Sequence, residues 1–236
     1  MNPVQLDNIT HRDLRIVTTR GAAWGDDQMT SPVFVSEFRS AQAYYPIVFQ
    51  PADNGPGMQP VALLGLRSGE NLFLEAHGWD AAYIPLAFQR GPFMIGRAGE
   101  QLMIHVDMDS PRIGHGEGEA AYLPHGATTD YLERVNSVLA AIHHGVETMP
   151  AFVAALLRHE LLESFVMDVE AADGSHNRLA GFHAIHEERL AALGAPALAE
   201  LHAAGHLEAI YMVLASTAHL RDLVERHDRR LKRTLA

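Results

Sequence analysis

A histidine and an aspartate two residues apart, His105 and Asp107, form the strongest candidate metal-binding pair in this sequence. On a strand, residues two apart lie on the same face, so both side chains would point to one side. With a distant histidine they would complete the two-histidine, one-carboxylate site of iron oxygenases. Nothing in the sequence chooses among the candidates for that third ligand, which are His125, His143, His183 and His186. A chain with fifteen histidines also produces such pairs by coincidence.

Two other histidine pairs have a spacing that suits metal binding less well. His202 and His206 are four apart, which places two imidazoles on one helical face, but Gly205 between them favours a break in the helix. His183 and His186 straddle a predicted strand-to-helix boundary. We therefore expect surface or capping roles for these histidines. The prediction is no cofactor, with iron as the alternative.

Composition excludes several classes of function. The 236 residues include 18 basic and 29 acidic side chains, a net charge of −11, and no cysteine. Disulfide frameworks, thiolate zinc sites and cysteine nucleophiles are therefore excluded. The acidic balance argues against nucleic acid as a partner, because duplex affinity comes mostly from basic side chains. The sequence also lacks the nucleophile-elbow, P-loop and dinucleotide-binding motifs, so it favours a non-enzymatic role.

The first half of the chain is predicted to be rich in strands. Short apolar runs alternate with turn residues there, which is typical of antiparallel sheets. The predicted strands are 14–17, 33–38, 44–49, 61–66, 71–74, 83–88, 93–95 and 102–106. Proline follows Tyr45 and Ile84, and the residue before a proline favours extended backbone, so Pro46 and Pro85 suit strand ends or edges.

From about residue 127 the apolar period changes to that of a helix. Leu132, Val135 and Leu139 recur at three and four, so this segment predicts an amphipathic helix. A second helix is expected directly after it, capped by Thr148 with Pro150 in its first turn.

The chain then predicts one hairpin and further helices. Strand-like runs at 165–169 and 179–185 flank Asp173-Gly174, a hairpin turn signal. Helices follow at 187–193 and 196–204, and a long terminal helix starts at 207. From Arg221 onward this end is basic, which would either dock an acidic partner or lipid surface or complement the helix dipole.

Together these segments predict an α+β fold in one domain spanning 1–236. Its β-rich part covers 10–125, and its helical part with one β-hairpin covers 127–236; the two halves are expected to share a core. The apolar run 209–220 is shorter than the roughly 20 residues that cross a bilayer, so we expect a buried helix and no membrane span. The first residues lack the features of a secretory signal, which predicts a cytoplasmic location.

An ordered set of motifs resembles the SapC family, which is named for a bacterial surface-layer (S-layer) system. The motifs are Glu37-Phe38, Tyr45-Pro-Ile-Val-Phe49, Leu63-Leu-Gly-Leu66, Gly69-Glu-Asn-Leu-Phe-Leu74, Trp79, Tyr83-Ile-Pro85, Arg90-Gly-Pro-Phe93 and, later, Leu179-Ala-Gly-Phe182. The similarity covers about residues 5 to 230. The signature residues that would frame a pocket are Glu37, Phe38, Tyr45, Pro46, Asn71, Trp79, Tyr83, Pro85, Arg90, Pro92 and Phe93.

The resemblance implies an accessory or interaction protein linked to S-layer proteins or to outer-membrane-receptor nutrient uptake. It implies no catalytic residue, and the partner is expected to be another protein, with a homodimer as one form. Two alternatives stay open: an iron oxygenase that uses His105 and Asp107, and a small-molecule or peptide-binding module with its pocket around Trp79 and Arg90. Asn71 and Trp79 would either recognise a planar or anionic group or be satisfied internally. Glu37 and Arg90 would pair with each other in an architectural role.

Overall fold

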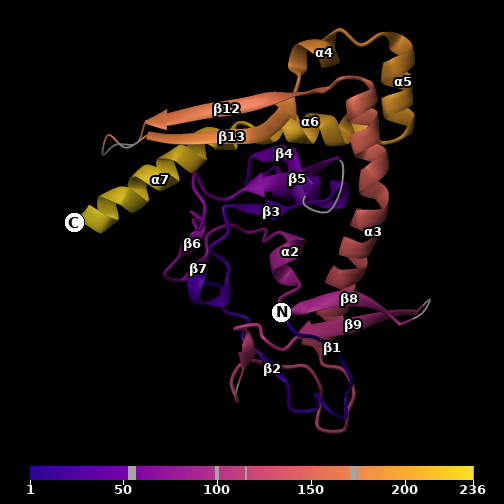
Figure 1. The fold of residues 1–236 in the computed structure, drawn as a ribbon, viewed down its shortest axis with the longest axis vertical. Helices are drawn as coiled ribbons and strands as arrows, with labels where there is room; N and C mark the ends of the chain where they lie inside the picture. The colour runs from indigo at the N-terminus through magenta and orange to yellow at the C-terminus, as the bar shows by residue number, and fades with distance from the viewer. Residues whose placement is uncertain (53–56, 99–100, 115, 171–173, 175, 236) are drawn as a thin grey trace.

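One long helix, α3 (Asp130–Arg158), connects the upper and lower parts of the computed structural model (Figure 1). The structure describes residues 1–52, 57–98, 101–114, 116–170, 174 and 176–235. The main sheet lies at one end of α3, and the sheet that contains β8 (Phe93–Ala98) and β9 (Gln101–Asp107) lies at the other (Figure 1).

The main sheet combines strands from both halves of the chain in the order β12-β13-β4-β5-β3. Its strands are β3 (Thr30–Pro32), β4 (Ile47–Pro51), β5 (Met58–Leu63), β12 (Leu162–Glu170) and β13 (His176–Ile185). All neighbours are antiparallel, and the hairpin joins the sheet where His183 of β13 pairs with Phe49 of β4. The predicted hairpin and the α+β fold are confirmed. Gly174 in its turn has a φ of 80°, and Asp173 lies outside the described residues.

Three smaller sheets lie beyond the main one. Their strands are β1 (Pro3–Gln5), β2 (Arg15–Ile16), β6 (Leu74–Glu75), β7 (Gly78–Trp79), β8 (Phe93–Ala98), β9 (Gln101–Asp107), β10 (Ile113–Gly114) and β11 (Glu119–Ala120). They form β1-β9-β8, β10-β2-β11 and the pair β6-β7. The strands predicted at 14–17, 93–95 and 102–106 are confirmed, whereas 71–74 is mostly a turn that leads into β6.

Two predicted strands are short helices instead. The run 33–38 contains the 3-10 helix η2 (Val35–Glu37) and the start of α1 (Phe38–Ala41). The Glu37 carboxylate turns back to accept a hydrogen bond from the Phe34 amide, which stabilises this tight turn. The run 83–88 contains α2 (Leu86–Gln89), and Pro85 at its N-cap begins a helix rather than ending a strand.

The two helices predicted around Thr148 are one. Instead of capping a new helix, the Thr148 hydroxyl donates back to the His144 carbonyl at 3.0 Å. Pro150 lies inside α3. Because α3 packs along two cores, the tertiary contacts outweigh the backbone hydrogen bond that proline cannot donate.

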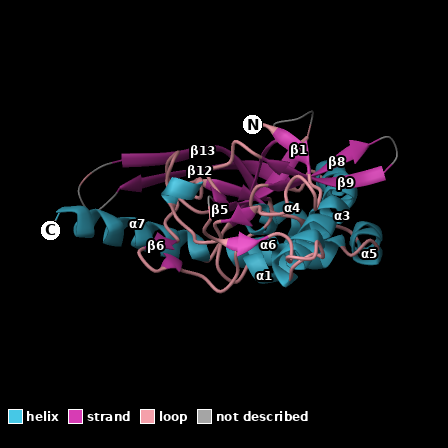
Figure 2. Ribbon diagram, turned by 90° about the horizontal axis from the view of Figure 1, so that it is seen from below, coloured by secondary structure: helices cyan, strands magenta, loops and turns pink. Residues whose placement is uncertain are grey.

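The chain ends in four helices, α4 (Glu187–Ala191), α5 (Ala195–Ala203), α6 (His206–Ser216) and α7 (His219–Leu235). Gly205, with a φ of 72°, separates α5 from α6, which confirms the predicted break between His202 and His206. The long terminal helix predicted from residue 207 is wrong. It is divided after Ser216, whose hydroxyl accepts from the Ile47 amide of the main sheet at 2.9 Å. Figure 2 shows α7 continuing past the main sheet near β6.

Two buried clusters of side chains form the core, and α3 contributes to both. The larger cluster packs Phe38, Tyr45 and Phe49 against Phe152. The smaller one surrounds Phe93 at the other end. Among the described residues, α3 is also the one helix that is long and apolar enough to cross a membrane. Core helices of globular proteins meet the same criteria of length and composition. Nine of its residues are buried.

Candidate functional site

The signature residues meet around the buried carboxylate of Glu37. One oxygen accepts hydrogen bonds from the Tyr83 hydroxyl at 2.6 Å and the Leu86 amide at 3.0 Å, and the other accepts from the Phe34 amide at 2.8 Å. Burial raises the pKa of Glu37, and these three hydrogen bonds oppose the rise. Glu37 therefore attaches the segment before α2 to the main fold.

A chain of hydrogen bonds continues from Tyr83 to Trp79. The Tyr45 hydroxyl donates to the Tyr83 carbonyl and accepts from the Trp79 indole at 2.8 Å. The Tyr45 ring meets Phe73 edge-on, and Trp79 packs on Phe88 with ring centroids 4.9 Å apart. Burial raises the pKa of both tyrosines, so they are donors at neutral pH. We call Glu37, Tyr45, Trp79 and Tyr83 the signature frame.

Other signature residues have structural roles around this frame. Asn71 donates to the Asp26 carbonyl at 2.8 Å and accepts from the Phe73 amide at 3.0 Å, so of the two alternatives for its side chain the structure shows the internal hydrogen bonds. Phe38 packs edge-on against Phe152. The Pro46 carbonyl accepts from the Leu63 amide at the entry to β4, which agrees with the predicted strand end.

Arg90 follows α2 directly and donates from Nη1 to the Phe93 carbonyl at 2.7 Å. Pro92 and Phe93 lead into β8, where Phe93 fills the smaller core. Burial lowers the pKa of Arg90, and the nearby Asp107 opposes this. Glu37 and Arg90 were expected to pair with each other. In the described contacts they do not, because Glu37 accepts from Tyr83, Phe34 and Leu86 and Arg90 donates to Phe93.

A buried ion pair that the sequence reasoning missed lies below α2. Asp26 and Arg112 are both buried, with Oδ1 and Nη2 2.5 Å apart. Arg112 also donates to the Val17 and Thr19 carbonyls, at 2.9 and 3.0 Å. Arg20 approaches the same carboxylate at 3.5 Å. Asp26 and Arg112 are 86 positions apart in the sequence, and no local motif marks them.

Two cavities flank α2. The first has a volume of about 270 Å³ and is lined by Trp24, Asp26, Phe88, Arg90 and Arg112 among others. The second has about 380 Å³ and is lined by Thr18, Arg20, Gln89, Glu119, Tyr131 and Arg134 among others. Together their walls contain four arginines and two acidic residues, in a protein of net charge −11. Of the two residues around which a pocket was predicted, Arg90 lines the first cavity, whereas Trp79 packs on Phe88 and lines neither of the two.

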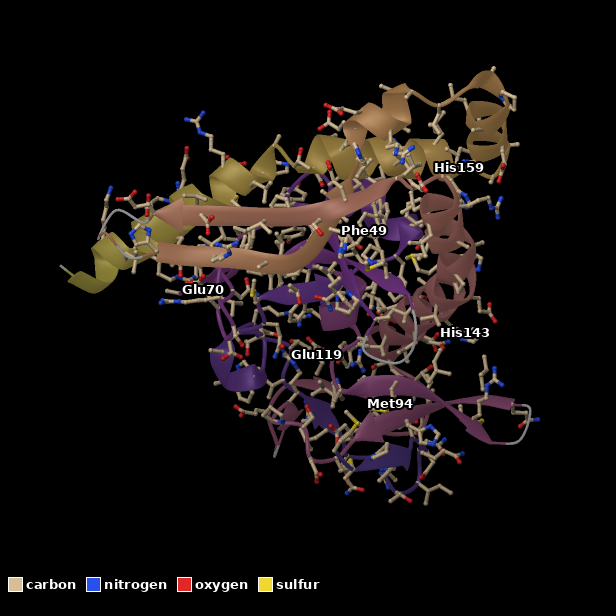
Figure 3. All side chains as sticks on the ribbon, turned by 45° about the horizontal axis from the view of Figure 1, so that its top comes forward. Phe49, Glu70, Met94, Glu119, His143 and His159 are labelled. Carbon is tan, nitrogen blue, oxygen red and sulfur yellow. The ribbon has the colours of Figure 1, made fainter. Side chains whose placement is uncertain are left out.

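Tyr131 at the start of α3 is the aromatic donor of the second cavity. Its ring packs near Phe93, and no described residue forms a hydrogen bond with its hydroxyl. Burial raises its pKa to about 12, against the opposing charges of Arg112, Arg20 and Arg134. The hydroxyl is therefore a neutral donor in the field of three arginines. Glu119, from β11, is labelled in Figure 3.

The predicted iron pair lies on β9, away from these cavities. The His105 ring lies over Gly96, where an added Cβ would approach it to 2.4 Å. Asp107 accepts from the Asn2 amide at 2.7 Å and from the Asp109 amide at 3.2 Å. Across the described residues there is no group of three histidine, aspartate or glutamate side chains placed to bind a metal. The iron hypothesis therefore lacks its third ligand in that part of the chain.

The basic C-terminal end docks on its own chain. Arg226 contacts Asp80 at 2.6 Å with its guanidinium 4.3 Å from the Phe73 ring centre, and Arg230 donates to two backbone carbonyls. Below them the buried His227 and Glu70 pair at 3.1 Å. Figure 3 shows Glu70 beside α7. These contacts attach α7 to residues 70–80, the segment that contains Trp79 of the signature frame.

Comparison with known proteins identifies one family. The SapC family model matches residues 6–223, nearly the whole chain, which confirms the predicted resemblance. In the other two comparisons, no curated protein and no solved structure matches this chain.

Proposed function

Because the chain belongs to the SapC family, we propose that it is a non-enzymatic accessory protein that acts by binding. In this proposal it works in the cytoplasm, in connection with S-layer proteins or with nutrient uptake through outer-membrane receptors. The supporting observation is that the polar groups fall into two sets. The polar groups of the signature frame form hydrogen bonds with one another, whereas the cavities beside α2 present arginine cations and a hydroxyl donor. Such groups orient and retain a ligand.

Deleting the gene in the organism that encodes it tests this role. Quantitative proteomics of the cell envelope should show reduced amounts of S-layer proteins or outer-membrane receptors, restored by the wild-type gene. An unchanged envelope proteome would contradict the proposal. Turnover of a defined substrate by the purified protein, lost on changing one polar residue, would contradict its non-enzymatic part.

A protein partner is favoured by the apolar side of α3. Val146 and Leu157 are 55% and 50% exposed, and apolar grooves of about 480 and 540 Å³ lie along this helix, the second between His143 and Met94 (Figure 3). Light scattering at micromolar concentration decides whether the partner is a second copy. A monomer would make the homodimer prediction wrong and leave a different protein as the partner.

A further inference from the structure

The second cavity beside α2 has a positive lining in a strongly acidic protein. Arg20 and Arg134 face one carboxylate there, that of Glu119. No described acidic side chain lies within 4 Å of the Arg134 guanidinium, and the exposed Arg134 has no described hydrogen bond. The lining therefore carries one uncompensated positive charge.

Arg20 is already held in place on the inner wall. Its Nη1 donates to the Phe88 carbonyl at 2.9 Å and lies 3.5 Å from Asp26, and its side chain is only 16% exposed. A guanidinium has five N–H donors, so donors remain for a ligand. Because the group is fixed before binding, little conformational entropy is lost when a ligand arrives.

Tyr131 and Arg134 are one helical turn apart at the start of α3 and line the same cavity. The Tyr131 hydroxyl has no described partner and lies in the field of Arg20 and Arg134. A hydroxyl donor and two guanidinium groups that line one cavity can together bind the oxygens of a carboxylate or phosphate.

We propose that the cavity beside Tyr131 binds a small ligand through an oxyanion group, either a carboxylate or a phosphate. Arg20 and Arg134 supply the charge, and Tyr131 donates a hydrogen bond. The volume of about 380 Å³ fits a metabolite-sized molecule, and the single net positive charge of the lining suits one anionic group rather than a polyanion. This inference rests on the proposed binding function and specifies its ligand class.

Titration of the 236-residue chain, followed by amide NMR, tests the site. The probes are inorganic phosphate, succinate and the uncharged succinamide, at low ionic strength because salt screens such contacts. We expect saturable shifts of amides around residues 18–20 and 131–135 with phosphate or succinate and none with succinamide. The anion that saturates identifies the phosphate or carboxylate class.

Two variants and a matched control locate the binding site on the protein. Arg134→Gln removes an exposed helical arginine and should weaken binding by about tenfold or more, as expected for a charge-assisted hydrogen bond. Tyr131→Phe keeps the ring and removes the hydroxyl, and should weaken binding by at least about threefold. Arg229→Gln removes another exposed arginine, from α7, and the affinity of this variant should stay at the wild-type value.

Three results would overturn the proposal: no saturable binding of either anion by the wild type, unchanged binding in both Arg134→Gln and Tyr131→Phe, or equal weakening in Arg229→Gln. Circular dichroism and thermal unfolding confirm that each variant is folded. If no anion binds while gene deletion still reduces envelope proteins, the ligand class is wrong and the accessory role stands. If an anion binds and deletion has no effect, the site stands and the role is wrong.

Discussion

Removing the Tyr83 hydroxyl tests whether the signature frame stabilises the fold. Tyr83→Phe deletes a 2.6 Å hydrogen bond to the buried Glu37 carboxylate and keeps the ring. The Tyr83 carbonyl still accepts from Tyr45, and Glu37 retains its two backbone donors, at 2.8 and 3.0 Å. The change therefore isolates one hydrogen bond to a charged acceptor.

Such a bond contributes about 1.5–3 kcal/mol, so we expect the free energy of unfolding to fall by about 2 kcal/mol. For a chain of this length that loss lowers the melting temperature by about 4–8 °C. With a urea slope of about 3 kcal/mol per molar, the unfolding midpoint falls by about 0.7 M.

Urea unfolding of wild type, Tyr83→Phe and Tyr211→Phe gives the comparison. Tyr211 is 55% exposed and has no described hydrogen bond, so the same chemical change there should alter stability by less than about 0.5 kcal/mol. If Tyr83→Phe changes stability as little as Tyr211→Phe does, the Tyr83–Glu37 hydrogen bond does not stabilise the fold.

Three further perturbations address other parts of the molecule. Burial raises the pKa of Glu37 in the folded state, so ionisation of this carboxyl lowers the free energy of unfolding as pH rises from about 4.5 through the folded pKa. In urea unfolding, the stability of wild type relative to Glu37→Gln should therefore increase as pH falls. A difference that does not change with pH would contradict this. Gly145→Ala would bring a Cβ within 2.5 Å of the Phe34 ring. Thermal unfolding should therefore show a net loss of stability of about 1–2 kcal/mol, although alanine has the better helix propensity. A stabilised variant would show that the Phe34 side chain moves to accommodate the methyl group. His227→Ala leaves the buried Glu70 without its partner on α7, so the free energy of unfolding should fall by about 2–4 kcal/mol. Amide hydrogen exchange in α7 should become faster relative to that in α3. Equal exchange rates in the variant and the wild type would show that the pair does not anchor α7.

Periodicity predicted the elements whose environment is simple. The α3 face and the β12–β13 hairpin were recognisable because each buries one side of a regular element. The errors occurred where side chains or tertiary contacts determine the backbone. The Glu37 carboxylate closes a 3-10 turn in a run that reads as a strand, and Pro150 continues within a helix that two cores support.

The candidate site was only partly predictable. The family motifs named Arg90 and the frame residues, yet they are silent on Arg20, Asp26, Arg112 and Arg134, which complete the cavities. Asp26 and Arg112 meet across a large sequence separation, so only the folded backbone brings them together. One feature of the composition did point to oxyanion binding. The chain has a single lysine, so arginine supplies nearly all of its basic charge. Arginine is the side chain that binds oxyanions in a bidentate manner.

A crystal structure of the chain grown with the anion that saturates in solution is the decisive test of the oxyanion site. We predict density for an oxyanion within hydrogen-bonding distance of the Tyr131 hydroxyl and the Arg134 guanidinium, with the Glu37–Tyr83 hydrogen bond intact. A cavity beside α2 closed by Glu119 on Arg134, with the anion bound elsewhere, would contradict it.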